Sequence, residues 1–373
     1  MSAATRRAHR SAPVSPARGP SPLLWPLLFV LSLLYRLAVL LRTAAYARGW
    51  LKPHRAACPV ISVGNLAIGG SGKTPLVEYL LRESLRAGKR PVCLTRGYRG
   101  HSRAALMRVR VSEGLPADPV ALGDEPAMLA RRNPDVTLYV GRARQSAARL
   151  AALWDAPELI VLDDGFQHLP LARDLDLLLI DAERGLGNGR LLPLGPLREP
   201  LRAGRRADAV LITKANLGDA QAVRRQVEQA LGGGLPVFTC DYTPRRLKRL
   251  DGAAERPPCA LAGQPVNLVC GIASPTGFIR SVEQLGAQVA TVRCYPDHHD
   301  YGSDDLEWLD AALAEVAEGA DAPLRWLTTE KDAVKLVGRL RHPQRLWLLE
   351  MAVVPDADAR AFLIEFIEKS GIL

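Results

Sequence analysis

A glycine-rich segment at residues 69–74, with the sequence GGSGKT, constrains the fold of this chain more than any other feature. It follows a short β-rich run, Val60 to Val63, and opens an amphipathic stretch from about Thr74 to Arg86. This order predicts a strand, a tight loop and a helix, which is the setting that a nucleotide-binding P-loop requires. Backbone N–H groups can wrap around a phosphate only where side chains leave room, and glycine supplies that room together with access to positive φ.

Each position of the predicted P-loop has an expected role. Lys73 would reach the β- and γ-phosphates, and the hydroxyl of Thr74 would bind Mg²⁺. The usual pattern has glycine where this chain has Ala67, so a glycine-rich turn that happens to precede Lys-Thr is the alternative interpretation. In the P-loop interpretation, the phosphates would be held by the four residues Gly69, Gly70, Ser71 and Gly72.

A P-loop predicts a second motif, an apolar strand that ends in an acid supporting Mg²⁺. The segment 158–164, ELIVLDD, fits this description, with Asp163 as the supporting carboxylate, although a single run of this kind is commonly structural. A third segment, Thr213 to Asn216, resembles the base-reading loop of GTPases, but Asn216 replaces the aspartate that recognises guanine. A nucleobase contact and a plain turn both remain open there, and ATP is favoured over GTP as the nucleotide.

Predicted strands and helices alternate along the chain, and each strand is a nearly continuous apolar run. Such runs are typical of a parallel sheet that is buried on both faces. The expected fold class is therefore α/β, a P-loop NTPase sheet with helices on both faces, joined to a smaller α/β domain and an N-terminal membrane helix. The expected strands are 60–63, 90–95, 136–140, 159–162, 175–180, 209–212, 266–270, 289–292 and 325–328, with helices at 74–86, 124–132, 144–153 and 278–285.

Changes in composition divide the chain into four parts. Residues 1–22 are rich in Ala, Ser, Pro and Arg and are expected to form a disordered basic tail. Residues 23–50 are expected to form a membrane-associated helix, 51–250 the P-loop domain and 251–373 the smaller domain. The boundary lies in a stretch at 240–265 that is rich in charges, Pro and Ala. A loop at 182–200, rich in Gly and Pro, is long enough to suggest a function of its own.

The net charge of +10 is concentrated at the N-terminus. Residues 1–55 contain nine Lys or Arg and no Asp or Glu, which leaves a net charge of +1 for the other 318 residues. A nucleic-acid-binding protein would carry its basic excess on a folded domain. Here the basic residues flank an apolar segment, which suits anionic lipid headgroups and argues against nucleic acid as a partner.

The apolar segment from Leu23 to Leu41 allows three interpretations. A transmembrane helix has a suitable length, but Arg36 within the segment and similar basic flanks on both sides argue against a simple span. A cleaved signal peptide usually has a shorter apolar region of ~7–15 residues. A helix lying in the membrane interface fits best, because Ser32, Arg36 and Thr43 share one polar face.

Several polar segments have both a structural and a functional interpretation. The segment 123–126, GDEP, precedes a predicted helix, so Asp124 is either a helix cap or a catalytic base. The run 297–300, DHHD, could bind metal, orient a distant carboxylate or form an exposed loop. An arginine near a transferring phosphate stabilises its charge, whereas most isolated arginines are solvated. The candidates of this kind are Arg142, Arg144 and Arg198, the last followed by Glu199.

As a set, these residues resemble the tetraacyldisaccharide 4′-kinases, the lipid A 4′-kinases of Gram-negative bacteria. The resemblance extends from about residue 23 to residue 336 and is far more specific than the P-loop alone. Alanine at position 67 is itself typical of this family. The matching stretches are 62–75, TRGYRG at 95–100, GDEP at 123–126, DDGFQH at 163–168, PLREP at 196–200, DHH at 297–299 and TEKD at 329–332.

The resemblance implies transfer of the γ-phosphate of ATP to the 4′-hydroxyl of a tetraacylated glucosamine disaccharide 1-phosphate, which gives lipid IVA. It implies a site in the cleft between the two domains and a location at the cytoplasmic face of the inner membrane. The implied partners are the lipid-linked disaccharide and membrane lipids, with no obligate protein partner. The implied site residues are Asp124 as base, His298 rather than His299 as its support, Lys73 and Arg142 at the γ-phosphate, and Thr74, Asp163 and Glu199 at Mg²⁺.

Parts of the sequence also fit two other functions. A membrane-associated P-loop switch ATPase would share the clustered glycines, but the lysine that marks such proteins would fall near Ile68 and is missing. A metal phosphoesterase could use the DHHD run, but that class needs several Asp and His motifs around one metal pair. The kinase interpretation accounts for more of the sequence than either alternative.

Overall fold

In the computed structural model, the described residues are 24–98, 100–102, 104–115, 117–316 and 324–370. The predicted tail at 1–22, together with Arg99 of the matched stretch at 95–100, lies outside these described residues. The chain forms two compact units. Of the described residues, the P-loop unit contains those within 24–243 and 352–370, and the small unit contains 244–316 and 324–351.

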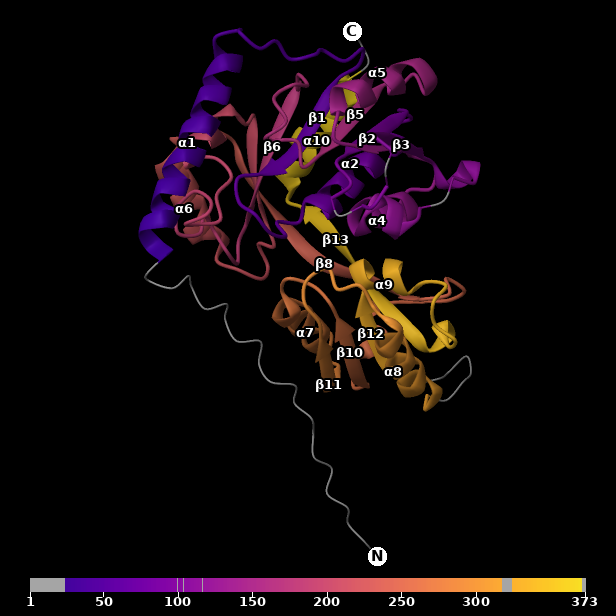
Figure 1. The fold of residues 1–373 in the computed structure, drawn as a ribbon. Coiled ribbons are helices and arrows are strands. Elements are labelled where there is room, and N and C mark those ends of the chain that lie inside the picture. Colours follow the sequence, from indigo (N-terminus) through magenta and orange to yellow (C-terminus); the bar gives the residue numbers. More distant parts are fainter. Residues whose placement is uncertain (1–23, 99, 103, 116, 317–323, 371–373) are drawn as a thin grey trace, which may run out of the picture. The chain divides into compact units, whose positions relative to one another are not determined.

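The P-loop unit is built on a largely parallel sheet (Figure 1). Its strand order is β8-β7-β6-β1-β5-β2-β4-β3, and each neighbouring pair is parallel except β3 with β4. The predicted parallel α/β sheet is confirmed, whereas the antiparallel edge strand was not predicted. The strands are β1 (Val60–Asn65), β2 (Pro91–Thr95), β3 (Leu106–Val109), β4 (Thr137–Gly141), β5 (Leu159–Asp163), β6 (Leu175–Asp181), β7 (Ala209–Thr213) and β8 (Val237–Arg249), the last continuing past Thr243.

Helices cover both faces of this sheet. They are α2 (Lys73–Arg86), α3 (Pro119–Leu122), α4 (Asp124–Arg132), α5 (Arg144–Trp154), α6 (Ala220–Leu231) and α10 (Ala357–Lys369), with short 3-10 turns η2 (Val111–Glu113) and η3 (Leu201–Arg206). Successive residues of a strand point to opposite faces, so a fully apolar strand supplies two cores at once. Val161 of β5 contributes to the core completed by α2, α4 and α10, whereas Ile160 and Leu162 contribute to the core beneath α5.

The C-terminal helix α10 belongs to the P-loop unit, although the sequence analysis placed residues 251–373 together in the smaller domain. Leu363 and Ile367 of α10 are buried in the same core as α2. The side chain of Asp356 caps α10 by accepting from the N–H of Ala359 (2.7 Å), and its other oxygen accepts from the N–H of Thr239 on β8 (2.7 Å). The apolar face of α10 therefore completes a core that begins some 300 residues earlier.

Leu363→Ala is expected to lower the free energy of unfolding by about 2–5 kcal/mol, because it leaves a cavity in a core with no solvent access. The measurement is urea denaturation followed by tryptophan fluorescence. Glu365→Ala, on the same helix but 63% exposed at the side chain, should change the free energy by less than about 0.5 kcal/mol. Equal effects of the two substitutions would contradict the assignment of α10 to this core.

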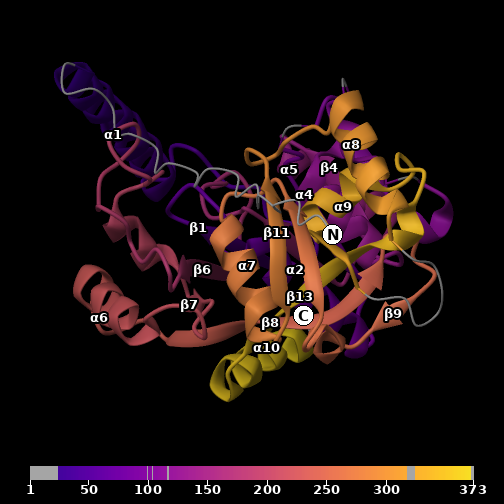
Figure 2. The same ribbon diagram turned by 90° about the horizontal axis from the view of Figure 1, so that it is seen from below.

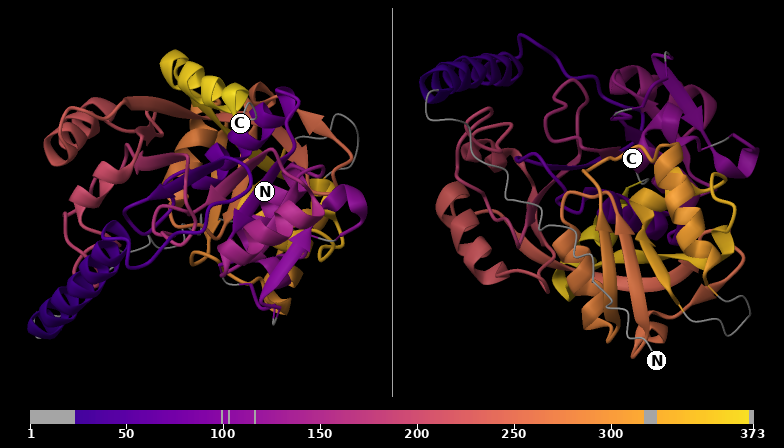
Figure 3. Two further views of the ribbon diagram at one scale, coloured as in Figure 1. Left: turned by 90° about the horizontal axis from the view of Figure 1, so that it is seen from above. Right: turned by 60° about the horizontal axis from the view of Figure 1, so that its bottom comes forward.

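The N-terminal helix α1 (Trp25–Ala47) lies along one edge of the P-loop unit (Figure 3). Ser32, Tyr35 and Arg42 donate hydrogen bonds to the backbone carbonyls of residues 191, 198 and 167, respectively. No residue of α1 is fully buried, and large apolar side chains such as Leu34 and Leu41 are more than half exposed. By length and composition α1 could cross a membrane, a test that some signal sequences and core helices also pass.

The small unit contains four parallel strands in the order β11-β10-β12-β13, which belong to the same continuous sheet as the strands of the P-loop unit. Helix α7 lies on one side of these strands and helices α8 and α9 on the other (Figure 2). Its strands are β9 (Glu255–Arg256), β10 (Pro265–Cys270), β11 (Gln288–Cys294), β12 (Trp326–Thr329) and β13 (Leu346–Pro355), the last continuing past Met351. Its helices are α7 (Pro275–Gln284), α8 (Ser303–Ala314) and α9 (Glu330–Leu336), with 3-10 turns η4 (Pro258–Leu261) and η5 (Pro343–Arg345).

Candidate active site

The P-loop connects β1 to α2 and is held by hydrogen bonds on two sides. Nδ2 of Asn65, the last residue of β1, donates to Oγ of Ser71 (2.8 Å). The hydroxyl of Thr213, at the end of β7, donates to the carbonyl of Ser71 (2.9 Å). On the other side, the N–H of Ile68 donates to the carbonyl of Pro196 in the long loop at 182–200 (2.8 Å). These three hydrogen bonds to neighbouring segments hold the P-loop in position.

Two glycines of the P-loop have backbone conformations that other residues rarely adopt. Gly69 has a φ of +113°, and Gly72, the N-cap of α2, has a φ of +74°. A Cβ atom on Gly69 would also lie 2.3 Å from Nη1 of Arg184, whereas the position of a Cβ on Gly70 is open. The loop thus leaves its backbone uncovered at the N-terminus of a helix, as phosphate binding requires.

The first turn of α2 meets the pair of acids, Asp163 and Asp164, at the end of β5. The side chain of Lys73 is 11% exposed, and its Nζ lies 3.5 Å from Oδ1 of Asp164. Thr74 is buried in the same turn. Asp163, the last residue of β5, is also buried and accepts from the hydroxyl of Thr95 at the end of β2 (2.8 Å). The structure therefore brings the predicted Lys73, Thr74 and Asp163 to one edge of the sheet.

The adjacent carboxylates of Asp163 and Asp164 differ in their protonation behaviour. Burial raises the pKa of Asp163 to about 6, and the carboxylates of Glu125 and Asp164 add to this effect. Burial also acts on Asp164, but Lys73 and Arg198 outweigh it and hold the pKa of that carboxyl at about 2. Thr74 in the first turn of α2 and Asp163 at the end of β5 are both buried, and their hydroxyl and carboxylate oxygens are a donor set that fits Mg²⁺.

Arg144, rather than Arg142, reaches the acid pair. Arg144 is the first residue of α5 and is 4% exposed, and its Nη1 donates to the carbonyl of Asp164 (3.1 Å). Burial lowers the pKa of Arg144, and the charges of Asp163 and Asp164 oppose this effect. Arg142 is exposed in the turn that precedes α5. Its predicted contact with the γ-phosphate stays a prediction.

The segment GDEP forms the start of α4, and its N-cap is Gly123, not Asp124. Gly123 has a φ of +91°, and a Cβ there would lie 2.4 Å from the carbonyl oxygen of Tyr98, so the segments around residues 98 and 123 pack closely. Asp124 is the first helical residue, which corrects its interpretation as the cap. Glu125, the next residue, contributes to the raised pKa of Asp163, so the start of α4 lies near the acid pair.

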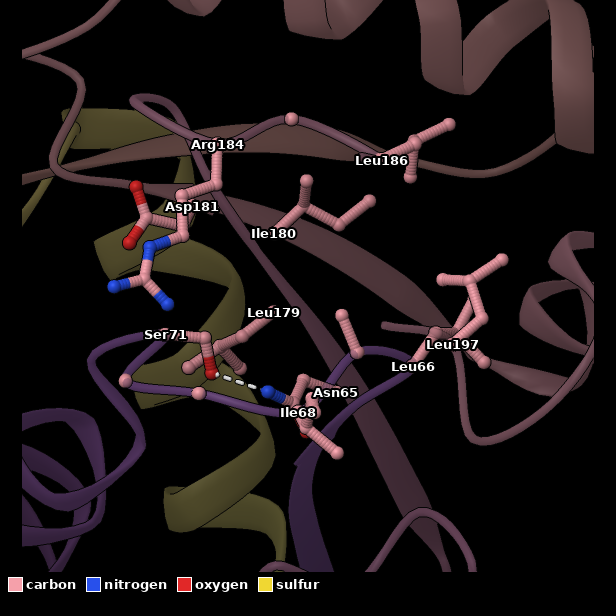
Figure 4. A pocket seen from close by; sticks show the side chains of 14 residues that line it. Asn65, Leu66, Ile68, Ser71, Leu179, Ile180, Asp181, Arg184, Leu186 and Leu197 are labelled. Carbon is pink, nitrogen blue, oxygen red and sulfur yellow. Dashed lines mark hydrogen bonds between the residues drawn. The ribbon is translucent and has the colours of Figure 1, made fainter. Parts of the chain in front are cut away.

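A partly open pocket adjoins the P-loop (Figure 4). Figure 4 shows Arg184 and Asp181 on the side of Ser71, and Leu186 and Leu197 farther along the pocket. The full lining is Asn65, Leu66, Ala67, Ile68, Gly69, Gly70, Ser71, Leu179, Ile180, Asp181, Arg184, Gly185, Leu186 and Leu197. The P-loop therefore forms one wall of a pocket that is polar near Ser71 and apolar beyond it.

In the small unit, the two adjacent histidines have different partners. Nε2 of His298 lies 3.0 Å from Nζ of Lys331, whereas Nε2 of His299 lies 2.8 Å from Oδ2 of Asp305. The ring of His299 stacks on Tyr295, with the centroids 4.3 Å apart. Within the described ranges, no group of three or more His, Cys, Asp or Glu could hold a metal ion. The geometry thus gives no support to the metal-binding interpretation of the DHHD run.

Comparisons with known proteins agree over nearly the whole chain. A family profile described as tetraacyldisaccharide-1-P 4′-kinase matches residues 24–368. The chain belongs to this family. The tetraacyldisaccharide 4′-kinase of Syntrophus aciditrophicus (strain SB) is 38% identical over 92% of this chain and 93% of its own length. That of Anaeromyxobacter dehalogenans (strain 2CP-C) is 42% identical over 81% of this chain and 79% of its own length.

A solved structure of the same family has the same fold. It is a crystal structure of LpxK from Aquifex aeolicus, described as an apo form in complex with ATP. It is 32% identical to this chain, has a TM-score of 0.74, and the match covers 92% of this chain and 99% of that one. The P-loop kinase fold predicted from the sequence is confirmed.

Glu199, which the family resemblance implied at Mg²⁺, and Asn216, which the sequence left open as a nucleobase contact, have structural partners of their own. The carboxylate of Glu199 is buried and pairs with Arg206 (2.6 Å). Asn216 accepts from the N–H of Tyr242 (2.9 Å) and donates to its carbonyl (3.1 Å). These two bonds favour the plain-turn interpretation of the segment 213–216. The role of Glu199 at Mg²⁺ stays a prediction.

Sequence reasoning missed two charged residues that the structure places at the P-loop. Asp164 was passed over because its neighbour Asp163 occupied the expected position at the strand end. Arg184 was missed because nothing in the sequence of the long loop shows that its side chain reaches Gly69. The DD pair was the available signal for Asp164, and there was none for Arg184.

Binding of the Mg²⁺ complex of a non-hydrolysable ATP analogue is expected to weaken about tenfold per pH unit as the pH falls below about 6. Asp163 is then increasingly protonated, and Mg²⁺ binds only the carboxylate. Because the pKa of Asp163 is raised on folding, its ionisation also reduces stability as the pH rises from about 4 to about 6. Calorimetric titration of the protein with the analogue from pH 5 to 7.5 tests the expected loss of affinity.

The control for this titration is Asp163→Asn. With this variant the nucleotide still takes up protons, but the titrating carboxylate at position 163 is absent. The affinity of the variant for the nucleotide should therefore depend less steeply on pH than that of the wild type. Identical pH profiles for the two proteins would rule out Asp163 as the group responsible.

Proposed function

We propose that this chain uses ATP and Mg²⁺ to phosphorylate the 4′-hydroxyl of a tetraacylated glucosamine disaccharide 1-phosphate, giving lipid IVA. Membership of the tetraacyldisaccharide 4′-kinase family supports this proposal. The structural observation that carries it is the contact between Lys73 of the P-loop and the strand-end acid pair. That contact gathers a phosphate-binding cation and metal-binding oxygens at a single edge of the sheet.

In this proposal, each group near the P-loop has a defined task. The exposed backbone of the loop binds the phosphates, and Lys73 neutralises the charge that spreads over the γ-phosphate during transfer. Mg²⁺, when bound, adds further positive charge at the phosphates, and Thr74 and Asp163 are the residues that would hold it. Asp124 accepts the proton of the sugar hydroxyl late in a loose transition state. Arg142, Glu199 and His298 are kept as predicted contributors.

We further propose that the enzyme works at the cytoplasmic face of the inner membrane. The acyl chains of such an acceptor stay in the bilayer, so the enzyme must approach the lipid surface. The exposed apolar side chains of α1 and the basic residues that flank it, such as Arg48 and Lys52, support this location.

The test is phosphate transfer from γ-labelled ATP to the tetraacyl disaccharide 1-phosphate in detergent micelles with Mg²⁺. The matched control is the same acceptor lacking its 4′-hydroxyl. Label that appears in the first lipid and not in the second supports the proposal. ATP hydrolysis that responds to membranes or to a protein, without labelled lipid, would instead favour a switch ATPase.

A further inference from the structure

A charged cluster in the small unit surrounds a histidine with an unusual backbone. His298 has a φ of +62°, in the left-handed region that few non-glycine residues adopt. Nζ of Lys331 lies 3.0 Å from Nε2 of His298 and 2.9 Å from Oδ1 of Asp297. The side chains of His298 and Lys331 are only 15% and 20% exposed. Backbone strain of this kind persists where the surrounding structure enforces it, often at functional sites.

Helix α9 holds this cluster in position. The side chain of Thr329 caps α9 by accepting from the N–H of Asp332. Asp332 is fully buried and accepts from the N–H of Gly271 (3.0 Å), and the carbonyl of Gly271 accepts from the N–H of His298 (3.2 Å). The TEKD segment thus anchors the loop that carries His298 and directs Lys331 at its ring.

The contact with Lys331 indicates which ring nitrogen of His298 carries the proton. A lysine ammonium only donates hydrogen bonds, so a contact through Nε2 of the ring requires a lone pair on that nitrogen. A neutral imidazole has one N–H, which must then be on Nδ1. Asp297 accepts a second hydrogen bond from the same ammonium and keeps it oriented.

We propose that Lys331 is a positioning residue that fixes His298 as its neutral Nδ1–H tautomer, so that the ring presents its hydrogen-bond donor at Nδ1. His298 then acts as a donor and not as the base. This inference rests on the proposed kinase function for the reaction in which the donor takes part. It gives the TEKD segment a task beyond starting a helix.

The neighbouring histidine provides an internal contrast. Nε2 of His299 faces a carboxylate oxygen of Asp305, which only accepts hydrogen bonds when ionised, so Nε2 of His299 carries a proton. Burial raises the pKa of Asp305, but its bonds with His299 and the N–H of Gly302 outweigh this effect and lower it. Adjacent residues should therefore show opposite protonation at Nε2.

Nitrogen-15 NMR of the full-length protein labelled at histidine tests the tautomer directly, with His298→Asn and His299→Asn used to assign the signals. We expect Nε2 of His298 to show the shift of an unprotonated ring nitrogen, and Nε2 of His299 that of a protonated one. In Lys331→Met, the His298 pattern should change while that of His299 persists. A protonated Nε2 of His298 in the wild type, or a pattern unaffected by Lys331→Met, would overturn the proposal.

Matched replacements of His298 test the donor at the level of activity. An asparagine amide can place an N–H near the position of Nδ1, whereas a glutamine amide reaches the position of Nε2. His298→Asn should retain a kcat within about tenfold of the wild type, and His298→Gln should lose about 100-fold, a loss typical of a missing catalytic hydrogen bond. A glutamine variant at least as active as the asparagine variant would contradict an Nδ1 donor.

The positioning role of Lys331 is tested by measuring separately how its replacement changes kcat and KM. Lys331→Met should lower kcat about tenfold with little change in the KM for ATP, and Lys331→Arg, which still donates to Nε2, should recover most of the loss. Lys369→Met, at an exposed site on α10, is the control and should leave kcat unchanged. Failure of the arginine rescue would leave Lys331 with a purely structural role. The NMR measurement needs no phosphate transfer, so it distinguishes failure of this inference from failure of the proposed function.

Discussion

Lys73→Met is expected to lower kcat for phosphate transfer by about 10³-fold while raising the KM for ATP only severalfold. The charge on the transferring phosphoryl group spreads in the transition state, so a fixed cation stabilises the transition state more than the bound substrate. Lys73 is suited to this because it is almost buried and already lies 3.5 Å from Asp164. The measurement is steady-state transfer of label with ATP as the varied substrate.

The fold should survive this substitution. Asp164 keeps its contact with Arg198, whose Nη1 lies 2.7 Å from Oδ2, so the carboxylate is not left without a counter-charge. The control is Lys89→Met, which removes a lysine from the loop after α2 and should leave kcat unchanged. A Lys73→Met enzyme that retains more than a tenth of the wild-type kcat would show that this loop does not hold the transferring phosphate.

The predicted site residues that the structure brings together at the P-loop are those whose positions local geometry determines. Gly69 and Gly72 need positive φ, and a helix start places Lys73 and Thr74 directly after the loop. Asp163 follows from the same logic, because the carboxyl ends of parallel strands share one edge of a sheet. For these residues, the spacing along the chain was enough.

The parts that could not be predicted depend on packing between distant segments. Arg142 and Arg144 are two residues apart, and only the start of α5 at Arg144 decides which of them turns inward. The place of α10 depends on a core shared with α2, and its own sequence shows only that it is amphipathic. The role of Lys331 depends on its contact with His298, which lies in a loop more than 30 residues earlier in the chain.

Asp124→Asn should lower kcat by about 10²–10⁴-fold with the KM for both substrates nearly unchanged, since a general base acts mainly in the transition state. Asparagine has nearly the same size and, because Gly123 is the N-cap of α4, removes no side-chain cap. The missing negative charge at the helix N-terminus is expected to lower stability by about 0.3–1 kcal/mol. A thermal melt of each variant checks that the fold is intact.

Asp135→Asn makes the same chemical change at an exposed aspartate just beyond α4 and should leave kcat within twofold of the wild type. The outcome separates two tasks that the same residue could perform. If Asp124→Asn melts close to the wild type yet loses transfer, the carboxylate acts on the substrate hydroxyl. If transfer persists and only the melting temperature falls, Asp124 serves the start of α4 alone, and the base must be sought elsewhere.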